Sequence, residues 1–139
     1  MIGVFLDHLN VPWTEHVFRL AKQTDTVLFL NNLGIVDVTS PIAILPSFNI
    51  WDFRGPIIAG DVFSARYLAD YKLIKDKYFY INSIDWNNGQ MAAIDVLTAT
   101  ELNLICEPTL VPLVKATFNK EPASVRNWDL NDIQRLLGR

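Results

Sequence analysis

Cysteine and long apolar runs are scarce in this sequence of 139 residues. Cys106 is the only cysteine, so no disulfide is expected within the chain and a reducing compartment fits best. It lies in the apolar run LNLICE, which predicts a buried, inert thiol. No apolar run approaches the ~20 residues that span a bilayer, and the first residues do not have the pattern expected of a secretory signal. We therefore expect a soluble, cytoplasmic protein with no membrane partner.

Positive charge is also in short supply. The chain has 12 lysines and arginines against 15 aspartates and glutamates, which gives a net charge of −3. Binding to a nucleic-acid backbone requires clustered basic residues, and here they are scattered. The closest group is Lys72, Lys75 and Lys77, which we expect in a solvated surface turn. The composition thus argues against nucleic acid as a partner.

Several well-known site motifs are missing as well. The first strand is not followed by G-x-G-x-x-G, and neither G-x-x-x-x-G-K-[ST] nor G-x-S-x-G occurs. His8 and His16 are the only histidines, too few with one cysteine for a metal site, so we predict no metal and no cofactor. The first helix has no acid before Glu15, so its early amides remain a candidate seat for an anion.

What the chain does have is a high apolar content, 50%, with short apolar runs that alternate with helical patterns. The runs predict strands, and the segments between them show helical spacing with capping residues at Asp61, Thr109 and Asp129. The strands are almost continuously apolar, which is typical of a parallel sheet covered on both faces. We therefore predict one domain over 1–139, a Rossmann-like, doubly wound α/β fold with a mostly parallel six-stranded sheet and helices on both faces. The expected strands are 2–6, 26–30, 42–46, 56–60, 77–82 and 102–107, and the expected helices are 12–21, 62–69, 89–101, 109–118 and a last one from 129.

The residues that follow each strand are the candidates for a site. Open α/β sheets bind ligands beyond the carboxyl ends of their strands, where the strand order reverses. We expect these polar tips to converge on one edge, either as a ligand cleft or as ordinary loop polarity. The catalytic candidates are Asp7 and His8, and the candidate substrate-binding residues are Asn31, Asn32, Ser47, Asp61, Asp85, Trp86 and Glu107.

Two groups of these residues have both a chemical and a structural interpretation. Asp7 and His8 could form an acid–base pair, or they could be the polar seam where a strand turns into a helix. Trp51, Trp86 and Trp128 lie outside the predicted strands and could stack on a sugar or a base, or cover the core. The sequence leaves both questions open.

Three stretches carry a resemblance to a known family. They are IIAGDVFSARYLADYK followed by KYFYINSIDW, then LNLICEPTLVPLVKATFN, and finally SVRNWDLNDIQRLL. In the order of their elements they resemble the N-terminal, acceptor-binding lobe of GT-B glycosyltransferases, and they look closest to small phage-encoded glycosyltransferase-like proteins. The last stretch is similar to the short strand and helix that close such a lobe.

The resemblance implies a function in glycosyl transfer, with Asp7 and His8 nearest the reacting sugar. A complete enzyme of that type has a second lobe that binds the nucleotide-sugar, so a partner subunit would have to supply it. The expected ligands are then a nucleotide-sugar or a glycan. The alternative is a non-catalytic ligand-binding or protein-interaction module, viral in origin, which forms a homodimer. A sensor of some other small molecule is the third interpretation.

Overall fold

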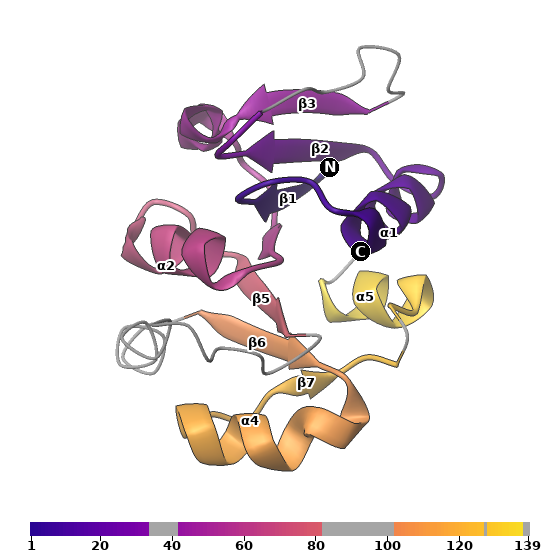
Figure 1. The fold of residues 1–139 in the computed structure, drawn as a ribbon, viewed down its shortest axis with the longest axis vertical. Helices are drawn as coiled ribbons and strands as arrows, with labels where there is room; N and C mark the ends of the chain where they lie inside the picture. Colours follow the sequence, from indigo (N-terminus) through magenta and orange to yellow (C-terminus); the bar gives the residue numbers. More distant parts are fainter. Residues whose placement is uncertain (34–41, 82–101, 127, 138–139) are drawn as a thin grey trace.

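The computed structural model describes residues 1–33, 42–81, 102–126 and 128–137. Within these residues the chain forms a sheet of seven parallel strands in the order β3-β2-β1-β4-β5-β6-β7 (Figure 1). This is the strand order of a doubly wound Rossmann-type sheet with one strand added. The strands are β1 (Ile2–Leu6), β2 (Thr26–Leu30), β3 (Ala43–Pro46), β4 (Ile57–Ala59), β5 (Lys77–Ile81), β6 (Asn103–Cys106) and β7 (Ala123–Ser124).

The predicted α/β class and parallel sheet are confirmed, but the strand count of six is wrong by one. The added strand, β7, has two residues and pairs with the end of β6. It is too short to give an apolar run, so the pattern of the strands did not predict it; only the family resemblance implied a short strand there.

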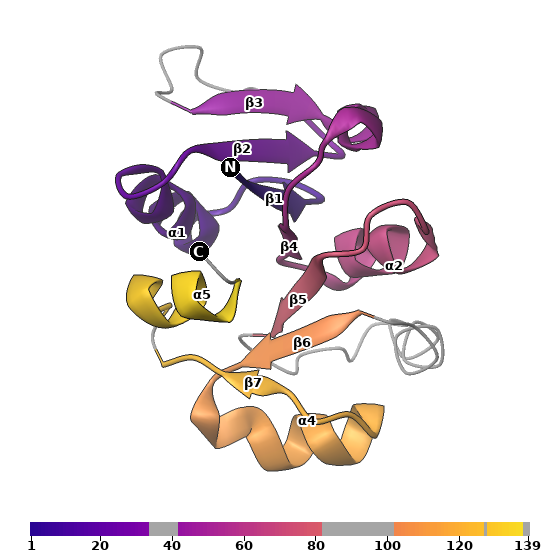
Figure 2. The same ribbon diagram turned by 180° about the vertical axis from the view of Figure 1, so that it is seen from behind.

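Helices cover both faces of the sheet, as predicted. On one face lie α1 (Val11–Ala21) and α5 (Leu130–Leu136), and on the other lie α2 (Val62–Asp70), α4 (Val111–Phe118) and the 3-10 helix η1 (Ser47–Asp52), as Figures 1 and 2 show. Each face has its own core of buried side chains, because alternate residues of a strand point to opposite sides. None of the described helices is both long and apolar enough to cross a membrane.

The helix starts show which capping predictions were right. Asp61 caps α2 by accepting a hydrogen bond from the Ser64 N–H at 2.8 Å, and Asp129 caps α5 in the same way. Thr109 does not cap α4: it lies in a 3-10 turn, η2 (Pro108–Leu110), and the N-cap residue of α4 is Leu110, with no side-chain hydrogen bond. The helix predicted over 89–101 lies outside the described residues.

Lys77 corrects the prediction of a solvated lysine turn. Its side chain is buried, and Nζ donates hydrogen bonds to the carbonyl oxygens of Leu68 at 2.9 Å and Tyr71 at 3.0 Å. The ammonium group thereby satisfies carbonyls at the end of α2, where a positive charge also suits the helix dipole. Lys72 and Lys75 are exposed, as predicted.

The sheet twists strongly from one end to the other. In Figure 1 the arrows of β2 and β3 point to one side and that of β6 points to the other, although each neighbouring pair is parallel. The carboxyl ends of the strands therefore fan out around the molecule. This matters for the site, because a common edge holds only for strands that are close neighbours in the sheet.

Candidate functional site

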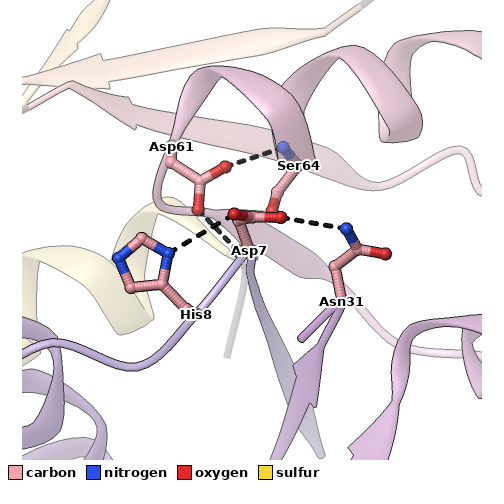
Figure 3. A network of polar contacts seen from close by, with 5 residues as sticks. All are labelled: Asp7, His8, Asn31, Asp61 and Ser64. Carbon is pink, nitrogen blue, oxygen red and sulfur yellow. Dashed lines mark hydrogen bonds and ion pairs between the residues drawn. The ribbon is translucent and has the colours of Figure 1, made fainter. Parts of the chain in front are cut away.

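A chain of polar side chains crosses the carboxyl ends of β1, β2, β3 and β4. Its centre is Asp7, directly after β1 (Figure 3). Asp7 Oδ1 accepts a hydrogen bond from Asn31 Nδ2 at 2.9 Å, and Asn31 Oδ1 accepts one from Ser47 Oγ at 3.3 Å. On the other side, Asp61 Oδ2 accepts from the Asp7 backbone N–H at 2.7 Å. We call Asp7, His8, Asn31, Ser47 and Asp61 the polar relay.

The relay lies at the point where the strand order reverses. From β1 the chain proceeds to β2 and β3 on one side, and β4 then pairs with the other side of β1. Asp7 follows β1 and Asp61 follows β4, so their bond joins the two strands at the switch point. The position is therefore the one at which this class of sheet binds ligands.

The two carboxylates of the relay accept hydrogen bonds from different kinds of donor. Asp61 uses one oxygen on the Ser64 N–H and the other on the Asp7 N–H, so it serves as helix cap and strand tie together. Asp7 accepts from side chains instead, and its own side chain is 32% exposed. Since a carboxylate accepts up to about four hydrogen bonds, Asp7 retains lone pairs that a ligand could use.

His8 stands beside Asp7 and is mostly exposed. Its Nδ1 lies 3.3 Å from Asp7 Oδ2. When Nδ1 carries the ring proton it donates to the carboxylate, and Nε2 of the neutral imidazole is left as the acceptor. This is the contact by which a carboxylate favours one tautomer of a histidine.

The anion-binding position expected at the start of α1 is occupied by the side chain of Asn10. Asn10 Oδ1 accepts a hydrogen bond from the Trp13 N–H at 3.1 Å, and so caps the helix. The sequence signal for this cap was present, since Asn10 precedes the proline of a first helical turn. With this cap and two carboxylates near the end of β1, the switch point does not suit a phosphate group.

The Trp13 ring packs directly against the backbone at the end of β4, beside the switch point. Gly60, directly after β4, packs so tightly that an added Cβ would overlap the Trp13 ring and Leu6 Cδ2. Trp13 is 2% exposed. Nothing in the sequence predicted this contact, because it joins the first turn of α1 to a glycine about fifty positions later.

Glu107 belongs to a second group, on the face covered by α1 and α5. Tyr80 Oη donates a hydrogen bond to Glu107 Oε1 at 3.1 Å, and the Tyr80 ring lies edge-on to Trp128 at 4.8 Å. Burial, and then the Glu107 carboxylate, raise the pKa of Tyr80. The twist of the sheet separates this group from the polar relay, so the expected convergence of all the tips on one edge holds for β1 to β4 and does not extend to β6.

The tryptophans differ in their exposure to solvent. Trp128 is fully buried, stacked on His16 at 5.0 Å with an angle of 25° between the rings, so it is part of the core and not a platform for a ligand. Trp51 is 53% exposed and lies edge-on to Tyr71.

The remaining candidate residues are Asn32, Asp85 and Trp86. Asn32 is exposed, and its backbone N–H donates to the Asp7 carbonyl at 2.7 Å. Asp85 and Trp86 lie outside the described residues.

The thiol and the candidate metal ligands add no further chemistry. Burial, and then Glu107, raise the pKa of Cys106 to about 11, so the thiol is protonated and inert at neutral pH. In the part of the chain that the structure describes, no three histidine, cysteine or acidic side chains are grouped as metal ligands would be. A cavity of about 550 Å³ lies away from the polar relay, at the amino ends of β5 and β6, and is lined in part by Tyr78, Asn103 and Lys120.

His16 predicts a pH dependence of folding. Burial, and then the charge of Arg19, lower its pKa from 6.5, while Glu15 and Glu107 oppose the shift. The unfolded chain therefore binds this proton more readily, and the stability that neutral His16 contributes is complete above pH 6.5 and lost as the pH falls through the lowered pKa. We expect urea unfolding from pH 5 to 8 to show this loss in the native protein.

The control for this prediction is His16→Phe, which keeps a ring against Trp128 but carries no proton. Both proteins contain the same carboxylates, so the pH-dependent contribution of these groups cancels when the two unfolding free energies are subtracted. The native protein should lose stability relative to the variant on acidification. A difference that stays constant from pH 8 to 5 would contradict the assignment.

Comparison with known proteins gives no assignment. No protein-family model, no curated protein and no solved structure matches this chain.

Proposed function

We propose that the polar relay binds a neutral, hydroxyl-rich ligand, the acceptor sugar of a glycosyl transfer reaction. The observation that carries the proposal is the relay itself: a part-exposed carboxylate at the switch point, held in place by Asn31, with an imidazole beside it. Sugar hydroxyls donate hydrogen bonds to carboxylates and accept them from amides and imidazoles. The resemblance to an acceptor-binding lobe supports the same assignment.

The charge of the site supports a neutral ligand over a phosphate. Asp7 and Asp61 are tied together at the end of β1 and β4, and the Asn10 side chain already caps α1. A nucleotide or phosphate placed here would face carboxylates where it needs N–H donors or cations. The nucleotide-sugar would therefore be held elsewhere, by a second subunit or another domain, as in the two-lobed enzymes that the chain resembles.

In this proposal His8 is the general base. His8 Nδ1–H donates a hydrogen bond to Asp7, and Nε2 accepts the proton of the acceptor hydroxyl as its oxygen attacks the sugar carbon of the donor. The bond from that carbon to the leaving group breaks, and the leaving group departs with the electron pair. Asp7 has a positioning role in this scheme and also stabilises the imidazolium that forms.

Binding without turnover is the competing function. The relay would then hold a glycan or another polar ligand as part of a recognition module, and His8 would only donate or accept a hydrogen bond. Titration of the protein with sugars, nucleotide-sugars and free nucleotides, followed by calorimetry and by NMR shifts, separates the two classes. Glycan binding together with product formation in the presence of a donor-binding partner supports transfer.

We expect Asp7→Asn to weaken glycan binding about tenfold, because a hydrogen bond to a charged acceptor becomes one to a neutral amide. Calorimetry measures the affinity, and urea unfolding shows whether the fold is kept. Asp25→Asn is the matched control: it removes the same charge from an exposed residue just before β2, at the other end of the strands. Equal affinities in both variants, or binding of free nucleotides alone, would overturn the proposal.

A further inference from the structure

We infer that the ligand is an oligosaccharide, not a single sugar, and that its further rings stack on exposed aromatic side chains of η1 and α2, the two helices that begin at the relay. This inference rests on the proposed function. The residues concerned, which we call the aromatic strip, are Phe48 and Trp51 of η1 and Phe63 and Tyr67 of α2. All four are exposed, Phe48 by 65% and Phe63 by 63%.

The strip is continuous with the relay along the chain. Ser47, which bonds to Asn31, is the first residue of η1, and Phe48 follows it directly. Asp61 caps α2, and Phe63 lies in the first turn after this cap. Phe63 and Tyr67 are four residues apart and so share one face of the helix. Figures 1 and 2 both show η1 and α2 on the same side of the sheet.

Two rings of the strip are fixed by buried neighbours. Tyr67 lies edge-on to Phe5 of β1, with 5.5 Å between the ring centres, and Trp51 lies edge-on to Tyr71 at 4.7 Å. Phe5 and Tyr71 are buried. A ring that is already held in place loses little conformational freedom when a ligand stacks on it, which favours its use as a platform.

A glycan fits the combination of relay and strip better than other occupants do. A nucleic-acid strand would stack on the rings, but its phosphates would meet Asp7 and Asp61. A sugar ring has hydroxyls for the relay and flat C–H faces for the aromatic rings, and it carries no charge. An oligosaccharide would therefore place one ring on the relay and the next rings over η1 and α2.

The test measures affinity against chain length. The probes are glycan ladders from one to six rings, built from glucose, galactose, mannose or N-acetylglucosamine, and binding is measured with the native chain and with Phe48→Ala and Phe63→Ala. We expect affinity to rise with chain length, and each variant to lose about threefold to tenfold of it for long chains only. Leu113→Ala, on the exposed face of α4, is the matched control and should bind as the native chain does.

The possible results separate the two proposals. Suppose the affinity does not depend on chain length or on either phenylalanine, but is lowered by Asp7→Asn. This result overturns the role of the aromatic strip in binding and leaves the proposed function standing. If no glycan binds, both proposals fail. If light scattering shows a dimer of the native chain that Phe63→Ala disrupts, the strip is an interface between copies of this chain, and the inference is overturned.

Discussion

Replacing Trp128 with alanine is expected to lower the free energy of unfolding by about 3–5 kcal/mol, the usual cost of truncating a buried tryptophan. Trp128 is 0% exposed and sits against Trp13, His16 and Tyr80, at ring distances of 5.1, 5.0 and 4.8 Å. Its removal would leave a cavity under the link to α5. Urea unfolding measures the loss, with trimethylamine oxide added to every sample so that the weakest variant still folds.

The backbone of Trp128 makes this prediction sharper. Its φ is 52°, in the left-handed region that a bulky residue rarely adopts. Glycine adopts this conformation without strain, so Trp128→Gly should be about 1 kcal/mol more stable than Trp128→Ala. Elsewhere glycine is the worse substitute, because it has more freedom to lose on folding.

Trp13 is the matched control, since it is equally large and buried but lies in the first turn of α1. Here Trp13→Gly should be less stable than Trp13→Ala, by up to about 1 kcal/mol. The expected result is therefore that glycine is more stable than alanine at position 128 and less stable than alanine at position 13. If glycine is worse than alanine at both, the left-handed backbone of Trp128 carries no strain that matters for stability.

Gly60→Ala should destabilise the protein by about 2–3 kcal/mol, a large effect for one added methyl group. The new Cβ would overlap the Trp13 ring and Leu6 Cδ2, both of which are buried and have little room to move. Gly3→Ala is the control: its added Cβ would lie 3.1 Å from the Ile57 and Phe29 side chains, a much milder contact. We expect less than half the effect there in urea unfolding.

A double-mutant cycle tests the cause of the Gly60 effect. In a Trp13→Leu background the ring is absent, so Gly60→Ala should cost clearly less than it does in the native chain, with a coupling of about 1 kcal/mol or more. If the cost is the same in both backgrounds, contact with the Trp13 ring is not the cause of the Gly60 effect.

The success of the fold prediction has a local cause. Apolar runs of four or five residues are buried on both sides of a parallel sheet, and this alone distinguishes such strands from half-exposed ones. Asp61 and Asp129 were correct as caps because capping depends on residues within one turn of each other. Where local signals were weak the prediction failed: β7 has two residues, and Thr109 lies in a 3-10 turn before α4.

The buried Lys77 shows a different limit. Along the sequence it is one of three nearby lysines, and only the return of α2 over β5 places the carbonyls of Leu68 and Tyr71 around its ammonium group. The candidate site was affected in the same way. The sequence placed the candidate residues just beyond the strands, but which of them meet depends on the tertiary structure. Asp7 contacts Asn31 and Asp61, Asn31 contacts Ser47, and Glu107 contacts Tyr80.

The sequence by itself determined the class of fold, the places of the strands and most of the residues beyond their ends, because these depend on short-range periodicity and capping. Only the tertiary structure decided which of those residues meet. It placed Trp13 over Gly60, buried Trp128 against His16 and divided the carboxyl edge into two groups. The physical reason is that sheet twist and ring packing are set by contacts between residues far apart in the chain, which no local pattern records.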